Sequence, residues 1–357
     1  MSEEKHVHVV GTGTIGEPLI GLLSDFRQEL GFDTVSFHKR TPLTSERAKV
    51  KNLLERGALL CTDAETIPKF EDQGMKVSMD AEEALRRAAV VIDCTPSGVG
   101  QANKHRNYER YTDSTLGFVA QGSEFGFGKM YARGVNDSAL RHGEDKYVQV
   151  VSCNTHNIAV LLRTLALAHD DPTNLVEAKF VMMRRASDLS QDGDYVPAPK
   201  VGKHDDPRFG THHARDAWHL FQTLGYDLNL FSSAIKLNTQ YMHCLWFSLK
   251  LKEKITLPQV IQRLNENRRV AVTEKKSANQ IFSYGRDHGH FGRILSQTVV
   301  PLPSLAVTGD HEIVGFAFTP QDGNPILSSV AISCWYMDPK GYESRLDCLR
   351  PFMFQEL

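Results

Sequence analysis

Short apolar runs separated by polar connections organise the amino-terminal part of the chain. Ala89–Cys94 is almost continuously apolar, as strands are when helices cover both faces of a parallel sheet. Runs of this kind predict a doubly wound α/β domain over residues 1–151. The predicted strands are His6–Val10, Thr34–Phe37, Ala89–Cys94, Leu116–Ala120 and Tyr147–Ser152.

A glycine-rich turn directly follows the first predicted strand. Residues 11–16 read GTGTIG, and the apolar Leu19, Ile20, Leu22 and Leu23 then indicate a helix. Glycines permit a tight turn and a close approach of the backbone to a ligand, and a helix amino terminus attracts a pyrophosphate. The order strand, glycine turn, helix favours a dinucleotide site over an ordinary glycine-rich turn.

The second predicted strand leads into the basic pair Lys39 and Arg40. An NAD site usually has an Asp or Glu at this place, bonded to the ribose 2′-hydroxyl, whereas two cations suit a 2′-phosphate. The pair therefore predicts NADP, with NAD as the second possibility. The alternative is that Lys39 and Arg40 are solvated loop charges.

Composition narrows the class of protein only moderately. A chain of 357 residues is long enough for two domains, and 41% hydrophobic and 24% charged residues are ordinary globular values. The formal net charge of -2 gives no reason to expect a nucleic-acid or membrane partner. Apolar runs such as Ala88–Ile92 are too short to cross a bilayer.

The six cysteines form no CxxC pair and have no regular spacing. This pattern disfavours a disulfide framework or a metal site and predicts free thiols in a reducing cytoplasm. Cys153 differs from the others because it lies between a predicted strand and the predicted helix Ile158–Ala168. A helix amino terminus stabilises a thiolate, and its free N–H groups can form an oxyanion hole. A nucleophile and an ordinary structural cysteine are both consistent with this position.

Paired cations and histidines in the second half are candidate partners of that cysteine. Arg184 and Arg185 end the predicted strand Ala178–Met183, where they suit a phosphate or form a strand-edge charge cluster. His212 and His213 lie in a polar stretch and could contact a phosphate or act as a base. His243 precedes the alternating run Cys244–Leu251, where a satisfied core histidine is the alternative.

Taken in order, these motifs resemble the archaeal-type glyceraldehyde-3-phosphate dehydrogenases over roughly residues 6–300. VVSCNT followed by the paired arginines and paired histidines is the most specific set. The matching segments are GTGTIG (11–16), KRTP (39–42), DCTPSGVGQANK (93–104), QGSE (121–124), VVSCNT (150–155), RRASD (184–188), THHARD (211–216), TQYMH (239–243) and SANQIFSYGRD (277–287).

The resemblance implies a role for each matching residue. Cys153 would be the nucleophile, and His243 the catalytic histidine that removes the hydroxyl proton of the thiohemiacetal. The substrate would be bound by Ser152, Asn154, Thr155, Arg184, His212 and His213. The cofactor would be contacted by Gly11, Gly13, Thr14, Ile15, Gly16, Lys39, Arg40, Thr95, Pro96, Gly122 and Arg185.

The resemblance also implies the reaction and the architecture. We expect reversible, NADP- or NAD-dependent oxidation of D-glyceraldehyde 3-phosphate with inorganic phosphate to 1,3-bisphosphoglycerate, a reaction of glycolysis and gluconeogenesis. A second, α+β catalytic domain over residues 152–338 would have a mainly antiparallel sheet. A terminal helix at about 339–357 would complete the cofactor domain. The assembly would be a cytoplasmic homotetramer without a metal.

Three departures from the family pattern keep other functions open. His156 replaces a threonine, Ser123 replaces a glycine, and the family's His-Gln-Glu-Ser segment is absent, with Ser333–Asp338 near its place. One alternative is a semialdehyde dehydrogenase or acyl-phosphate reductase of the same architecture. Such an enzyme would need only one arginine for a substrate carboxylate. Another is a non-catalytic NADP-binding redox sensor that uses Cys153.

Overall fold

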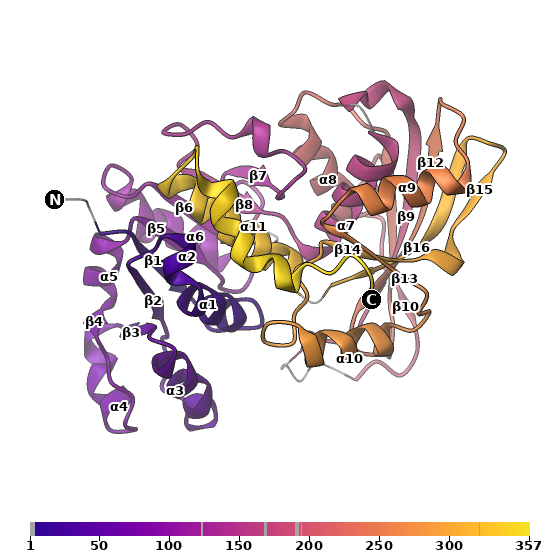
Figure 1. The fold of residues 1–357 in the computed structure, drawn as a ribbon. Helices are drawn as coiled ribbons and strands as arrows, with labels where there is room; N and C mark the ends of the chain where they lie inside the picture. The colour runs from indigo at the N-terminus through magenta and orange to yellow at the C-terminus, as the bar shows by residue number, and fades with distance from the viewer. Residues whose placement is uncertain (1–3, 123, 168–169, 190–192, 194, 321) are drawn as a thin grey trace. The chain divides into compact units, whose positions relative to one another are not determined.

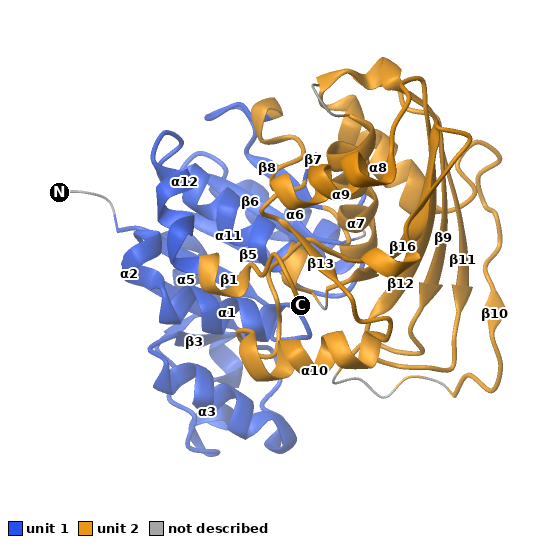
Figure 2. Cartoon of the chain, turned by 45° about the vertical axis from the view of Figure 1, so that its right-hand side comes forward, with its two compact units in different colours: residues 1–131, 140–150, 325–349 blue, residues 132–139, 151–324, 350–357 orange. Residues whose placement is uncertain are grey.

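The computed structural model describes residues 4–122, 124–167, 170–189, 193, 195–320 and 322–357. The chain forms two compact units, and Figure 2 shows them in different colours. Unit 1 comprises residues 1–131, 140–150 and 325–349, and unit 2 comprises residues 132–139, 151–324 and 350–357. Among the described residues, no helix has the length and apolarity required to span a membrane.

Unit 1 is built on an eight-stranded sheet with the order β4-β3-β2-β1-β5-β6-β8-β7 (Figure 1). Every neighbouring pair is parallel, which confirms the predicted doubly wound α/β sheet. The strands are β1 (His6–Val10), β2 (Thr34–His38), β3 (Leu59–Thr62), β4 (Met79–Asp80), β5 (Val90–Asp93), β6 (Gly117–Gln121), β7 (Lys129–Tyr131) and β8 (Tyr147–Val150).

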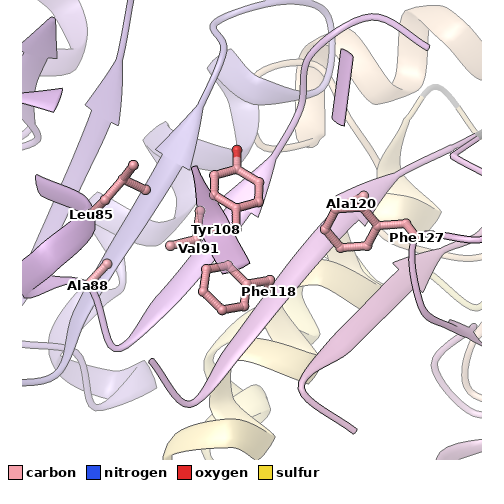
Figure 3. Close-up of a cluster of buried hydrophobic side chains, with 7 residues drawn as sticks. All are labelled: Leu85, Ala88, Val91, Tyr108, Phe118, Ala120 and Phe127. Atoms are coloured by element: carbon pink, nitrogen blue, oxygen red, sulfur yellow. The ribbon is translucent and has the colours of Figure 1, made fainter. Parts of the chain in front are cut away.

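Aromatic side chains form part of the core of unit 1 beside its central strands. Figure 3 shows this cluster, in which the Tyr108 and Phe118 rings stack with centroids 5.3 Å apart. Both side chains are fully buried, so they contribute apolar area to folding. The helices of this unit are α1 (Gly16–Asp25), α2 (Arg27–Leu30), α3 (Arg47–Glu55), α4 (Ile67–Glu71), α5 (Ala81–Arg87), α6 (Val99–Arg106), most of α11 (Gly323–Met337), and α12 (Tyr342–Arg345).

The long carboxy-terminal helix lies earlier than the sequence predicted. It is α11, which ends at Met337, and residues 339–357 contain only the short α12 and a 3-10 segment, Leu346–Phe352. Pro339 disfavours a helical Asp338, and the Asp338 carboxylate accepts the Gly341 N–H (2.9 Å) to close a turn. The helix predicted at about 339–357 is therefore wrong in position. Residues 333–337 form the end of α11, and Asp338 directly follows it.

Unit 2 is built on a mixed sheet with the order β10-β11-β9-β12-β16-β14-β13, and β15 pairs with β16. Its long central pairs, β9 with β12 and β12 with β16, are antiparallel, which confirms the predicted mainly antiparallel sheet. The pairs β9–β11 and β13–β14 are parallel. The strands are β9 (Leu175–Arg184), β10 (Lys200–Val201), β11 (Leu230–Lys236), β12 (His243–Leu251), β13 (Val270–Thr273), β14 (Thr298–Pro301), β15 (Ala306–Thr308) and β16 (Glu312–Thr319).

Helices of unit 2 cover one face of this sheet (Figure 2). The first of them begins at Cys153, earlier than the predicted Ile158, because Ser152 acts as its N-cap and accepts the Thr155 N–H at 3.3 Å. This start places Cys153 in the first turn. The helices are α7 (Cys153–Leu161), α8 (His212–Gln222), α9 (Leu257–Glu266) and α10 (Ala278–His288).

Candidate active site

The glycine turn of unit 1 joins β1 to α1. Gly11 has φ +99°, and a side-chain carbon on Gly16 would overlap the Gly11 carbonyl oxygen, so both positions require glycine. A carbon on Gly13 would meet nothing within 4 Å. The N-cap residue of α1, Ile15, makes no side-chain cap hydrogen bond, and Thr14 and Gly16 flank it. The open space at Gly13 and the uncapped helix end fit an approaching pyrophosphate.

A cavity of about 710 Å³ lies beside this turn, at the carboxyl ends of β1, β2 and β5, and we call it the glycine-loop pocket. Ligands of open α/β sheets bind at this edge. Gly122, which also lies at a strand end, follows β6 with φ +72°, and Ser123 lies outside the described residues. The predicted cofactor residues that line the pocket are Gly11, Thr95, Pro96, Lys39 and Arg40.

Lys39 and Arg40 have different surroundings. The Lys39 side chain is only 8% exposed, and its ammonium forms an ion pair with Glu46 and lies 3.4 Å from the Thr12 hydroxyl. Lys39 is therefore not a solvated loop charge. Arg40 is exposed. Of this pair, Lys39 is therefore held in place, whereas Arg40 is free to follow a ligand.

Two buried carboxylates shape the loops around the pocket, and sequence reasoning missed both. Asp93 accepts hydrogen bonds from four donors: the Thr95 N–H and hydroxyl, the Asn103 amide (2.8 Å) and the Tyr108 hydroxyl (2.6 Å). Glu124 accepts the N–H groups of Gly98 and Gln101 at the start of α6. Asp93 therefore holds Thr95 in place. The only available signal was its position at the end of an apolar strand.

Cys153 lies at the amino terminus of α7 in unit 2. Its carbonyl accepts a hydrogen bond from the Asn324 amide at 2.9 Å, which ties this turn to the start of α11. Burial raises the pKa of the Cys153 thiol to about 12, and the nearby Asp322 adds to this rise. Arg185 and the Asn154 N–H lower the pKa of the same thiol, but they do not compensate for burial.

Arg184 and Arg185 point in different directions because side chains alternate along a strand. Arg184 is exposed. The Arg185 side chain is 4% exposed and donates to the Asp188 carboxylate (3.0 Å) and the Tyr241 carbonyl (3.1 Å). Its guanidinium also lies 4.0 Å from the Asp322 carboxylate. We refer to Cys153, Arg185, Asp188, His243 and Asp322 as the Cys153 cluster.

His243 begins β12 and pairs across the sheet with Thr319 of β16. The Thr319 hydroxyl donates to the side-chain amide oxygen Oδ1 of Asn154 (3.3 Å) and accepts from the side-chain amide of Asn157 (2.8 Å). These bonds tie the first turns of α7 to the strand end that carries His243. Burial, Arg185 and Arg184 lower the pKa of His243 to about 3, so its ring is neutral.

A second cavity, of about 320 Å³, carries several cations and is here called the anion cavity. The His213 ring stacks on His212, with centroids 4.0 Å apart, and its Nε2 lies 3.3 Å from the Asn154 amide nitrogen. Asn154, the residue that follows Cys153, therefore connects this cavity to the start of α7. Burial lowers the pKa of both histidines, that of His213 more strongly. The basic residues lining it are Arg184, Lys203, His212, His213 and Arg215, with Asp205 and Asp206 also present.

The structure does not bring Thr155 or His156 to either cavity. Thr155 is fully buried, and its hydroxyl lies 3.0 Å from that of its N-cap, Ser152. His156 is also fully buried, and its Nδ1 lies 3.1 Å from the Ser152 carbonyl oxygen. The replacement of the family's threonine by His156 thus changes a buried position of α7, and not the lining of either cavity. In the described part of the chain, no group of three or more His, Cys, Asp or Glu side chains is arranged to hold a metal ion.

Comparison with known proteins places the chain among dehydrogenases. No family model matches it. It is 30% identical to the glyceraldehyde-3-phosphate dehydrogenase of Methanobacterium formicicum over 80% of each chain. The enzymes of that name from Sulfolobus acidocaldarius and Methanothermus fervidus are 26% and 25% identical, covering 85% and 91% of this chain and 84% and 91% of theirs. The chain belongs to the archaeal-type glyceraldehyde-3-phosphate dehydrogenase family.

Proposed function

We propose that this protein oxidises D-glyceraldehyde 3-phosphate with NADP and inorganic phosphate, reversibly, through a thioester on Cys153. The observation that carries the proposal is the link between Cys153 and a cationic cavity. Asn154 follows the cysteine and lies 3.3 Å from His213 of the anion cavity. A phosphorylated aldehyde needs such an arrangement, with its phosphate held close to the nucleophile.

Residues of unit 2 would perform the acyl chemistry. The Cys153 thiolate attacks the aldehyde carbon, and the resulting oxyanion is stabilised by N–H groups at the start of α7 and by His243. Arg184, His212 and His213 hold the substrate phosphate, while Ser152 and Asn154 flank the carbonyl. Thr155, predicted to bind substrate, supports this turn from its buried position.

Residues of unit 1 would hold the cofactor. The turn from Gly11 to Gly16 receives the pyrophosphate, and Thr95, Pro96 and Gly122 line the strand ends beyond it. Lys39 and Arg40 face a 2′-phosphate, which favours NADP over NAD. When bound, the oxidised nicotinamide ring is the hydride acceptor of the reaction. The contact of Arg185 with the cofactor stays a proposal. Within unit 2, Arg185 bonds to His243, Tyr241 and Asp188.

The anion cavity supports this function over its closest alternative. A semialdehyde dehydrogenase binding a carboxylate needs a single arginine, whereas Arg184, Lys203 and Arg215 all line this cavity together with two histidines.

The outer face of the unit 2 sheet supports the proposed homotetramer. Val181, Trp246 and Phe316 are direct cross-strand partners on this face, and Phe316 is 38% exposed. Such an apolar row fits burial against a second copy of the chain. We place the protein in the cytoplasm because its six cysteines are free thiols. A change of Phe316→Glu should shift the mass measured by light scattering toward smaller species.

The decisive experiment follows the reduction of NADP by glyceraldehyde 3-phosphate with and without phosphate or arsenate. We expect phosphate-dependent turnover that falls by about 10⁴-fold or more in Cys153→Ser, because the nucleophile is lost. The control is binding of NADP by the same variant, which should be unchanged. Absence of turnover with NADP and NAD, despite cofactor binding, would contradict the proposal and favour the semialdehyde dehydrogenase.

A further inference from the structure

Four alternating charges lie beside the glycine turn of unit 1, and one of them is the pocket cation Lys39. The Lys39 ammonium pairs with one oxygen of the Glu46 carboxylate, and the Lys49 ammonium donates to the other oxygen at 3.0 Å. Lys49 also lies 3.4 Å from the carboxylate of Glu17, in the first turn of α1. We call Lys39, Glu46, Lys49 and Glu17 the charge network. Its two cations and two carboxylates leave it without net charge.

Glu46 supplies a carboxylate at a place where the sequence pattern has none. An NAD site usually has an acidic residue at the end of its second strand, whereas here Lys39 directly follows β2. Glu46 lies seven positions further on, in the 3-10 turn Thr44–Glu46 before α3, and its side chain reaches Lys39. The site therefore combines a cation that suits a 2′-phosphate with a carboxylate that opposes it.

The Lys39 ammonium is shared between the charge network and the glycine-loop pocket. Its side chain is only 8% exposed, it lines the pocket, and the Thr12 hydroxyl lies 3.4 Å from its nitrogen. An ammonium has three donors, so one remains for a ligand beside Glu46 and Thr12. Burial raises the pKa of Glu46, but hydrogen bonds from Lys39 and Lys49 outweigh burial and lower it, so the carboxylate is ionised.

We propose that Glu46 sets the cofactor selectivity of the glycine-loop pocket, because it offsets the attraction of Lys39 for a 2′-phosphate and so allows both NADP and NAD to bind. The inference rests on the proposed function in taking these dinucleotides as ligands. A 2′-phosphate that bonds to Lys39 also approaches the negative charge of Glu46, which repels it. NAD has a neutral 2′-hydroxyl, so neither charge changes its affinity much. Glu46 is a positioning residue, since it acts through Lys39.

Two carboxylates of the charge network separate this effect from a change in net charge. Glu46→Gln and Glu17→Gln remove the same charge, but Glu46 pairs with Lys39 whereas Glu17 pairs with Lys49. In calorimetric titrations we expect Glu46→Gln to bind NADP about tenfold more tightly and NAD within about twofold of wild type. Glu17→Gln should change both affinities by a similar factor, because the pyrophosphate near α1 is common to both cofactors. Equal changes for NADP and NAD in Glu46→Gln, or an equal shift of their ratio in Glu17→Gln, would overturn the inference.

Lys49→Gln changes the same selectivity in the opposite direction. It removes the second cation bound to Glu46, so more of the carboxylate's negative charge acts on a 2′-phosphate. NADP should then bind about three- to tenfold more weakly relative to NAD. Thermal unfolding of each variant confirms that it is folded. An unchanged or increased preference for NADP in folded Lys49→Gln would refute the role of Glu46, even if Glu46→Gln itself did not fold.

Adenosine 2′,5′-bisphosphate and 5′-AMP test the site without a nicotinamide ring or an aldehyde. We expect Glu46→Gln to bind the bisphosphate about tenfold more tightly and 5′-AMP within about twofold of wild type. The same response to both fragments would contradict the inference. If the two fragments respond differently but the protein fails to oxidise glyceraldehyde 3-phosphate, the proposed reaction fails and the role of Glu46 stands.

Discussion

The glycine-loop pocket of unit 1 and the Cys153 cluster of unit 2 differ in how completely their buried charged groups are hydrogen-bonded. In the pocket, Asp93 accepts from four donors and Lys39 is paired with Glu46. In the cluster, Arg185 Nε and Asp322 Oδ2 are buried and have no hydrogen-bond partner among the residues that the structure describes. A charged group whose hydrogen-bonding positions are all occupied holds the surrounding loops in a fixed shape. A charged group with an unoccupied position can still bond to a reacting molecule.

The difference also appears in the protonation states of the cluster. Burial keeps the Cys153 thiol protonated and the His243 ring neutral, through a raised and a lowered pKa respectively. The negative charge of the Cys153 thiolate therefore has to form during the reaction, because the resting thiol is protonated. The following predictions test the contrast between the two regions, from the largest expected effect to the smallest.

Acid should destabilise both units through buried neutral histidines. Burial lowers the folded-state pKa of His6 in unit 1 and of His156 in unit 2 from 6.5 to about 4. Above pH 6.5 neither state takes up a proton, and below it the unfolded chain binds protons that the folded chain does not. Each histidine should therefore reduce the free energy of unfolding by about 2 kcal/mol at pH 5.

Urea unfolding at pH 7 and pH 5 measures this loss. His6→Gln and His156→Gln should each show a smaller loss between the two pH values than the wild type. If the units unfold in separate transitions, each variant should affect only the transition of its own unit. A loss identical to that of wild type in both variants would remove these histidines as the cause.

Two glycines of the same turn should respond differently to alanine. Gly16→Ala forces a carbon against the Gly11 carbonyl and should lower the free energy of unfolding by roughly 1–3 kcal/mol. Gly13→Ala, with open space around it, should stay within about 0.5 kcal/mol of wild type and still weaken NADP binding. Thermal unfolding and fluorescence titration with NADP measure both effects. Equal stability of the two variants would contradict the steric argument.

Removing the charge of Asp322 should make Cys153 more reactive. Asp322 raises the pKa of the thiol, so Asp322→Asn lowers that pKa and increases the thiolate fraction at pH 8. We expect iodoacetamide to react up to about tenfold faster, which corresponds to one pKa unit. Asp188→Asn is the matched control with a smaller increase, because its side chain is 57% exposed and screened by water. An unchanged rate in Asp322→Asn would show that burial alone sets the pKa.

The smallest effect concerns cofactor preference in the glycine-loop pocket. Lys39→Ala and Arg40→Ala should each weaken NADP binding by about fivefold and leave NAD binding nearly unchanged, because only NADP has the 2′-phosphate. Calorimetric titration with both cofactors measures the ratio. Arg40→Ala serves as the reference for Lys39→Ala, since it removes an exposed charge without opening an ion pair. Equal losses for NADP and NAD would place both cations away from the 2′-phosphate.

Much of unit 1 follows from local sequence. The predicted strands His6–Val10 and Thr34–Phe37 match β1 and β2 closely, and the glycine turn lies where its motif placed it. The sequence patterns that predict these strands and this turn each consist of a few adjacent residues. The helix α11 carried no such signal, because Gly323–Met337 is largely buried and has no polar face to produce a helical period.

By itself, the sequence determined the fold class, the glycine turn and the position of the candidate nucleophile, because each depends on neighbouring residues. Only the tertiary structure decided the chemistry around Cys153. Asn324 reaches the Cys153 carbonyl across 171 positions, and Asp322 approaches Arg185 from the same distant segment. The protonation of His243 likewise depends on a backbone amide from another strand and on burial. No local pattern encodes either, since both arise from packing distant segments together.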